Sequence, residues 1–227
     1  MNNVILKAKN IKKSYDQNQV LDLDKIKIYE SSLNFLIGPN GSGKTTLLNI
    51  LSLVDTDYCG KVIYRDREIN KEEFDILNLR RNFSVIWQNP YLFKGNVTSN
   101  IGLPLKLRKE NNQKINKKVN QIAKELDITN LLDKRSNELS GGERQKVSIA
   151  RALITEPEIL FIDEPNNSLD YESSRYFNNL FSNLTEEGIT ILLITHDLYQ
   201  IKNFADYITI LNKGEVLESG PSHKIDI

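Results

Sequence analysis

The 227-residue chain lacks the features that mark disulfide-stapled, membrane-spanning or strongly charged proteins. Its single cysteine, Cys59, excludes an intrachain disulfide framework and fits a reducing compartment. Its 30 lysines and arginines match 30 aspartates and glutamates, so its charge gives no sign of a general nucleic-acid binder. No apolar run approaches the ~20 residues that span a bilayer, and the N-terminus lacks the apolar core of a signal peptide. We therefore expect a cytoplasmic chain of one domain, or of one domain with a subdomain.

What the chain does have is a phosphate-binding loop. Residues 38–46 read GPNGSGKTT and meet the spacing G-x-x-x-x-G-K-[ST], between an apolar strand-like run and a helical pattern. Glycines let successive N–H groups point at one anion, so Lys44 is expected to reach the β- and γ-phosphates of a nucleotide and the Thr45 hydroxyl to coordinate Mg²⁺. The alternative is a glycine-rich turn before a helix. The residues expected to hold the nucleotide here are Gly38, Pro39, Asn40, Gly41, Ser42, Gly43, Lys44, Thr45 and Thr46.

A second segment, residues 159–165, reads ILFIDEP and predicts a buried strand followed by two carboxylates. A continuous apolar run suits a strand of a parallel sheet, and ligands bind such sheets at the carboxyl ends of their strands. Because adjacent carboxylates repel each other without a cation, we expect Asp163 to hold Mg²⁺ and Glu164 to orient or deprotonate the attacking water. Alone, this pattern is also compatible with an ordinary strand-to-loop exit.

The third segment, Leu139–Leu153, reads LSGGERQKVSIARAL. Together the three segments resemble the ATP-binding subunits of ABC transporters, and the likeness runs from Val4 to about Pro221. LSGGE is the signature of that family, and P-loop kinases and GTPases do not carry it. The resemblance implies an ATPase that uses ATP and Mg²⁺.

The signature is implied to bind the γ-phosphate of ATP held by the opposite subunit, through Ser140, Gly141 and Gly142. The residues fit this geometry, because Ser140 is a good N-cap and Glu143 completes a capping-box pattern. The same pattern also indicates a well-capped core helix. The chain carries one cassette, so we expect it to pair with a second ATP-binding subunit, as a homodimer formed on ATP binding.

Three further residues match the family in the expected order. Tyr15 stands where members carry an aromatic that stacks on adenine, although a lone tyrosine is more often a packing residue. Gln88 matches the glutamine that contacts Mg²⁺ or the attacking water, and it is otherwise a polar residue at a strand end. His196, after an all-apolar run, matches the switch histidine that contacts the γ-phosphate.

A fourth match is Asp170, in the loop that crosses the dimer interface in the family. Asn166 and Asn167 stand where threonine and serine are usual. This departure leaves the chemistry intact and puts the detail of coupling between the subunits in doubt.

The fold class expected is α/β, with a P-loop NTPase core of mostly parallel sheet, an N-terminal antiparallel β layer and a helical subdomain that bears the signature. The resemblance implies one ABC ATPase domain, 1–227, with residues 1–95 and 138–227 in the core and 96–137 in the helical subdomain, which has the signature at its end. Apolar patterns predict strands at 20–28, 61–69, 159–163, 190–195, 207–211 and 215–218, and helices around 115–126 and 176–181.

The implied function is to supply energy to a membrane transporter through permease subunits, which places the chain on the cytoplasmic face of the membrane. An exposed patch of Tyr91, Leu92 and Phe93 is expected to dock that partner. The sequence around this patch resembles that of importers of oxyanions such as tungstate, molybdate or phosphate. The alternative is a soluble ABC ATPase, such as one that assembles iron–sulfur clusters.

Overall fold

The computed structural model describes residues 3–70, 76–165 and 171–226. Its strands are β1 (Val4–Tyr15), β2 (Asn18–Tyr29), β3 (Leu33–Ile37), β4 (Cys59–Tyr64), β5 (Arg67–Glu68), β6 (Phe83–Ile86), β7 (Ile159–Asp163), β8 (Thr190–Ile194), β9 (Tyr207–Asn212) and β10 (Glu215–Pro221). Its helices are α1 (Lys44–Leu51), α2 (Ile76–Arg80), α3 (Val97–Leu107), α4 (Asn112–Glu125), α5 (Gly141–Leu153), α6 (Tyr171–Glu186) and α7 (Leu198–Phe204). Within these described ranges, no helix has the length and apolar character needed to cross a membrane.

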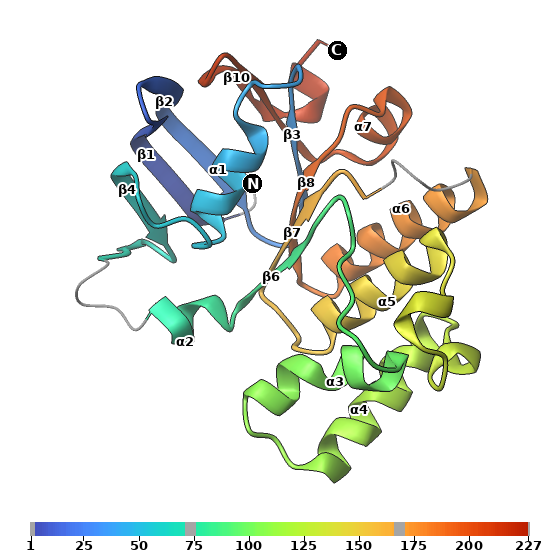
Figure 1. Cartoon of the computed structure of the whole chain (residues 1–227). Coiled ribbons are helices and arrows are strands. Elements are labelled where there is room, and N and C mark those ends of the chain that lie inside the picture. Colours follow the sequence, from blue (N-terminus) through green and yellow to red (C-terminus); the bar gives the residue numbers. More distant parts are fainter. Residues whose placement is uncertain (1–2, 71–75, 166–170, 227) are drawn as a thin grey trace.

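The strands form two sheets (Figure 1). The four-stranded sheet has the order β2-β1-β4-β5, and all its pairs are antiparallel. The six-stranded sheet has the order β10-β9-β3-β8-β7-β6, in which β10 at the edge is antiparallel to β9 and the other pairs are parallel. The expected fold class, a mostly parallel core sheet with an N-terminal antiparallel layer, is confirmed.

Strands β3, β7 and β8 at the middle of the large sheet are buried along their whole length. Successive side chains of a strand point to opposite faces, and here they enter different cores. Leu36 and Phe161 pack with α1 and the antiparallel sheet, whereas Phe35 and Leu160 pack with α5 and α6. Because both faces are covered, these strands need continuous apolar runs.

The prediction of one strand over residues 61–69 is wrong. The chain turns back after β4, and β5 pairs antiparallel with it. Arg65 and Asp66 adopt left-handed backbone conformations, with φ of 46° and 61°, as a tight two-residue hairpin turn requires. Neither residue is glycine or asparagine, so the sequence carries no clear turn signal here.

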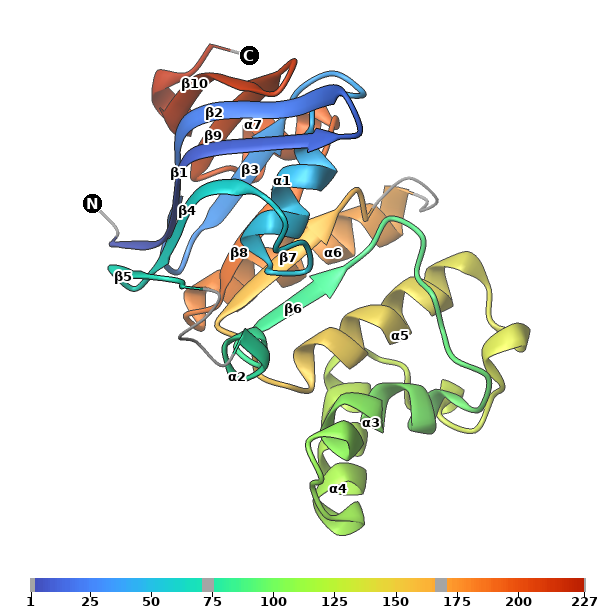
Figure 2. The same cartoon turned by 60° about the vertical axis from the view of Figure 1, so that its left-hand side comes forward.

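Helices α3 and α4 lie away from the antiparallel sheet, with α5 between them and the central sheet (Figure 2). The predicted apolar stripe of α4 is buried, and the Asn111 side chain caps the helix by accepting the Lys114 N–H. Gly102 of α3 permits the close approach of α4, because a Cβ there would lie 2.8 Å from a methyl group of Ile115. This packing joins both helices to the core that contains α5 and α6.

Candidate nucleotide site

The phosphate-binding loop joins the end of β3 to the start of α1, as the sequence predicts (Figure 1). Gly38 and Gly43 have φ of 148° and 100°. A Cβ at Gly38 would lie 1.9 Å from the carbonyl oxygen of Leu211 in β9, and a Cβ at Gly43 would lie 2.7 Å from the Leu21 side chain in β2. Both positions therefore need glycine, and the loop is packed between strands of the two sheets.

Lys44 is buried at the start of α1 and donates hydrogen bonds to the carbonyls of Gly38 and Pro39, both at 2.9 Å. Burial lowers the pKa of Lys44, and two nearby carboxylates offset part of that effect. In the part of the chain that the structure describes, the buried Ser42 hydroxyl has no hydrogen-bond partner. An ammonium and an unsatisfied hydroxyl beside a helix N-terminus can be satisfied by phosphate oxygens, so the loop fits the triphosphate of ATP.

Asp163 ends β7, and only 6% of it is exposed. The Thr45 hydroxyl donates to its Oδ2 at 2.9 Å. Burial raises the pKa of Asp163, the Thr45 hydrogen bond lowers it, and the neighbouring Glu164 raises it further, so the net shift is upward. A hydroxyl and a carboxylate beside bound phosphates are the oxygen ligands that Mg²⁺ takes, so these residues fit that ion.

Glu164 lies between the other two side chains that we expect to act in catalysis. Gln88 Nε2 donates to Glu164 Oε2 at 3.1 Å, and His196 Nδ1 lies 3.5 Å from Glu164 Oε1. The three residues follow β6, β7 and β8, which are neighbours in the parallel sheet, so their carboxyl ends meet at one edge. The structure thus brings together groups that are far apart in the sequence.

A pocket of about 400 Å³ opens over the phosphate loop, Gln88, Asp163 and Glu164, and His196 lies outside its lining. Its lining residues are Val20, Asn40, Gly41, Gly43, Lys44, Thr45, Thr46, Gln88, Asp163 and Glu164. Val20 is the one member that sequence reasoning did not place here. It lies in β2, and its alternating apolar pattern indicates a strand but not which element that strand touches.

Tyr15 lies outside the lining of this pocket, at the end of the hairpin that carries Val20. Its side chain is 46% exposed, and its hydroxyl donates to Asp55 Oδ2 at 3.3 Å. An exposed aromatic side chain is compatible with stacking on a base.

The signature begins α5 with the expected capping box. Ser140 Oγ accepts the Glu143 N–H at 3.3 Å, and Glu143 Oε2 accepts the Ser140 N–H at 2.8 Å. Ser140 and Gly141 are exposed, Gly142 is half-buried, and none of the three lines the pocket. The predicted Asp170 loop, with Asn166 and Asn167, lies outside the described residues.

The profile of the family described as "ABC transporter" matches residues 21–167. The chain belongs to this family. It is 36% identical over 211 residues to the tungstate uptake system ATP-binding protein TupC of Peptoclostridium acidaminophilum, covering 92% of this chain and 95% of the relative. It is 32% identical over 218 residues to the arginine transport ATP-binding protein ArtM of Bacillus subtilis, covering 95% and 91%.

Solved ABC cassettes share the fold. A dimeric post-hydrolysis state of the cassette MJ0796 bound to ADP and Pi superposes with a TM-score of 0.86 at 27% identity, over 96% of this chain and 99% of that one. The cbiO1 protein of Clostridium perfringens gives a TM-score of 0.88 at 26% identity, over 98% and 90%. The chain is therefore the ATP-binding and hydrolysing subunit of an ABC transporter, and the alternative of a soluble ATPase outside transport is not supported.

Proposed function

We propose that this chain powers the import of an oxyanion such as tungstate. The observation that carries this proposal is the likeness to the tungstate uptake subunit over 92% of the chain. The test is to purify the chain with its co-purifying membrane subunits, reconstitute them in vesicles with ATP on the side of the chain, and measure uptake. We expect ATP-dependent uptake of tungstate, and uptake of arginine in its place would contradict the proposal.

For the chemistry, ATP binds the phosphate loop with Lys44 on the β- and γ-phosphates. Thr45, Gln88 and Asp163 would hold Mg²⁺, which would neutralise charge on the phosphates. Glu164 orients or deprotonates the attacking water, and Gln88 and His196 hold its carboxylate from either side. His196 reaches the γ-phosphate, and Tyr15 stacks on the adenine.

The chain acts with a second copy of itself, and each ATP lies between the phosphate loop of one copy and the signature of the other. The support is that Ser140 and Gly141 are exposed at a helix N-terminus and lie outside the pocket of their own chain. Dimeric cassettes among the structural relatives agree with this arrangement. One ABC ATPase domain, with core residues 1–95 and 138–227 and helical subdomain 96–137, then contributes to both sites of the dimer.

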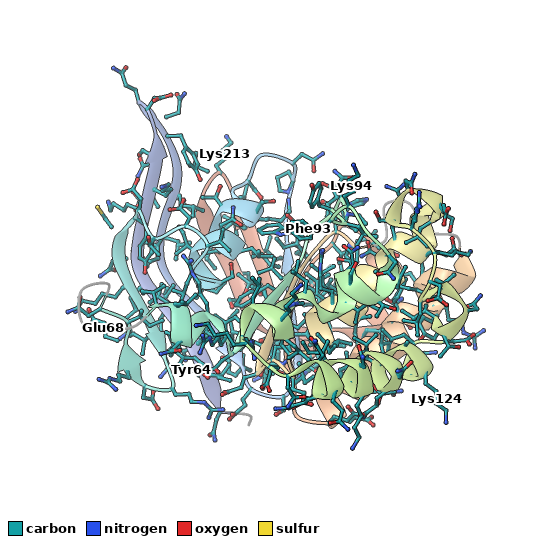
Figure 3. The ribbon with its side chains drawn as sticks, turned by 60° about the horizontal axis from the view of Figure 1, so that its bottom comes forward. Tyr64, Glu68, Phe93, Lys94, Lys124 and Lys213 are labelled. Atoms are coloured by element: carbon teal, nitrogen blue, oxygen red, sulfur yellow. The ribbon has the colours of Figure 1, made fainter. Side chains whose placement is uncertain are left out.

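The permease docks beside the loop between β6 and α3, on which Figure 3 labels Phe93 and Lys94. Tyr91 and Phe93 are 68% and 48% exposed and contact each other at 5.2 Å between ring centroids. The expectation that Leu92 is also exposed is wrong, because it is half-buried and packs against the core. This docking holds the chain at the cytoplasmic face of the membrane.

The docking surface continues into a groove of about 310 Å³ between β6, α3 and α5. Phe93 and the exposed Leu107 line it, together with Arg108 and Arg151. Within the described residues, Arg151 Nη1 is buried without a hydrogen-bond partner, and burial lowers the pKa of this guanidinium. The groove thus combines apolar side chains with the Arg151 guanidinium, which lies 5.8 Å from the centroid of the Phe93 ring. Such a surface suits a permease helix that carries an acidic side chain.

A further inference from the structure

An ion cluster lies beside Tyr15 at the end of the β1–β2 hairpin, with Lys13 and Asp55 largely buried and Asp57 exposed. Lys13, only 5% exposed, places its Nζ 2.9 Å from Asp55 Oδ2 and 3.2 Å from Asp57 Oδ2, and it also donates to the Asp57 carbonyl. The Tyr15 hydroxyl donates to the same Asp55 oxygen at 3.3 Å, and the centroid of its ring lies 4.9 Å from Lys13 Nζ. Tyr15 is therefore held at its tip by a carboxylate and on one face by a cation.

The same cluster connects Tyr15 to the helix that follows the phosphate loop. The N–H of Asp55 donates to the carbonyl of Asn49 in α1 at 3.0 Å. On its other side the hairpin meets the loop directly, because a Cβ at Gly43 would lie 3.0 Å from the Val20 carbonyl oxygen. The position of the Tyr15 ring relative to the phosphate loop is thus set by two contacts, one through Asp55 to α1 and one through Val20 to Gly43 of the loop.

The pKa shifts of Lys13 and Asp55 favour the charged form of both side chains. Burial by itself lowers the pKa of Lys13, but hydrogen bonds to Asp55 and Asp57 bring it above the usual lysine value. Burial would raise the pKa of Asp55, but the Lys13 hydrogen bond brings it below the usual aspartate value. An ammonium over one face of an aromatic ring attracts its π electrons and leaves the opposite face less negative. A purine base stacks on that opposite face with less repulsion.

We propose that Lys13 and Asp55 are positioning residues that hold Tyr15 as the platform for the adenine base of ATP. The proposal rests on the contact between Tyr15 and adenine, which is part of the proposed function. Asp55 fixes the direction of the ring, and Lys13 covers the face that the base does not use. Loss of either residue weakens binding through the base and leaves the contacts with the triphosphate unchanged.

The test compares two ligands of the purified chain by isothermal titration calorimetry, both with Mg²⁺. One is the non-hydrolysable analogue β,γ-imido-ATP, and the other is inorganic tripolyphosphate, which has no base. We expect Tyr15→Ala to weaken the ATP analogue about 5- to 150-fold, the range for base–aromatic stacking. Lys13→Met and Asp55→Asn should weaken it about 2- to 30-fold, while Lys13→Arg retains most of the affinity. The affinity for tripolyphosphate should stay constant in all four variants.

The matched control is Lys12→Met, at the neighbouring position of β1. This variant removes an exposed ion pair with Asp22 of β2 and should change neither affinity. Equal weakening of both ligands by Lys13→Met and Asp55→Asn would show a purely structural role and overturn the proposal. If these two variants keep the parental affinities while Tyr15→Ala binds the ATP analogue more weakly, the positioning role of Lys13 and Asp55 is overturned and only the role of Tyr15 as the adenine platform stands. An unchanged Tyr15→Ala would overturn both.

Discussion

Asp163 and Glu164 are neighbours in the chain but have different surroundings. Asp163 is almost fully buried and is bonded to Thr45, whereas Glu164 is less buried, has a left-handed backbone with φ of 44°, and meets Gln88 and His196. Two carboxylates with such different environments suit two roles, metal binding for the first and water activation for the second.

The first prediction concerns Glu164→Gln. The amide keeps the shape of the side chain but lacks the basic oxygen, so we expect nucleotide binding to persist and turnover to fall by about 10²- to 10⁴-fold. Phosphate release measures turnover, and calorimetry with the ATP analogue measures binding. Glu215→Gln, at an exposed position of β10, is the control and should behave as the parent chain. A Glu164→Gln variant with near-parental turnover would show that Glu164 is not the base.

The second prediction concerns pH and Asp163. Because the pKa of Asp163 is raised in the folded chain, its contribution to stability is complete below the unfolded pKa and is lost as the pH rises through the folded pKa. Without nucleotide at pH 7, Asp163→Asn should therefore melt at a higher temperature than the parent, by about 2–4 °C for each kcal/mol relieved. The gain should shrink as the pH falls toward 3.8, the ordinary aspartate value.

With Mg²⁺ and the ATP analogue, the parent should melt at a higher temperature than Asp163→Asn. The carboxylate of the parent binds the cation, and the variant lacks this carboxylate. Asp24→Asn, on the exposed part of β2, is the control for a simple loss of one negative charge. Thermal melts at several pH values check both statements. A variant that melts below the parent without ligand would contradict the assigned cost of burying Asp163.

At this scale, the sequence predicts residues whose spacing is fixed by a motif, such as Lys44, Thr45 and Asp163. It does not predict Val20 or Asp55, because tertiary contacts bring them to the site from segments without a motif. The sequence also does not predict the partial burial of Leu92, because both of its neighbours in the chain are exposed and only tertiary packing turns its side chain to the core.

At the scale of elements, long and strongly patterned segments are predicted well. Strands β7 and β8 are continuous apolar runs, and α4 has a buried stripe with helical spacing. Helices α2 and α7 were not predicted, because segments of 5 and 7 residues are too short for a periodic pattern to be recognised. Helix α7 is instead set by its N-cap, Asp197, which accepts the N–H groups of Tyr199 and Gln200.

The third prediction concerns the loop between β6 and α3. Replacing Tyr91 and Phe93 together by serine should leave the ATPase rate of the isolated chain within about twofold of the parental rate. Exposed side chains contribute little to stability, so the fold that holds the nucleotide site should persist. The same double variant should lose most of its co-purification with the membrane subunits and its coupled transport. Leu217→Ser, which removes an exposed side chain on β10, is the control. Normal coupled transport by the double variant would rule out docking at this loop.

At the scale of the whole molecule, the phosphate loop and the signature belong to different cores. Helix α1 packs with the antiparallel sheet, whereas α5 packs on the opposite face of the central sheet with α3, α4 and α6. One chain therefore carries the two motifs on opposite faces of its central sheet. The sequence predicts that the signature lies in a separate helical subdomain, but it does not predict which face of the sheet that subdomain covers. We expect a chain that is monomeric without nucleotide and a two-fold dimer with ATP, because two γ-phosphates add binding energy that hydrolysis removes.

The fourth prediction tests that arrangement by mixing two inactive variants, Lys44→Ala and Ser140→Arg. In a mixed dimer both lesions fall on one site, and the other site combines an intact loop with an intact signature. Random mixing should restore about a quarter of the parental rate, since half of the dimers are mixed and each keeps one of two sites.

Rescue will not occur if hydrolysis requires both sites, so a second measurement is needed. An ATP analogue with a photoreactive group on the γ-phosphate should label the Lys44→Ala chain only when the Ser140→Arg chain is present. The Lys44→Ala chain has lost its own phosphate contact, so the label can reach it only from nucleotide on the partner. Labelling that is confined to the Ser140→Arg chain in proven mixed dimers would contradict the shared site, because each γ-phosphate would then face only the chain that binds it.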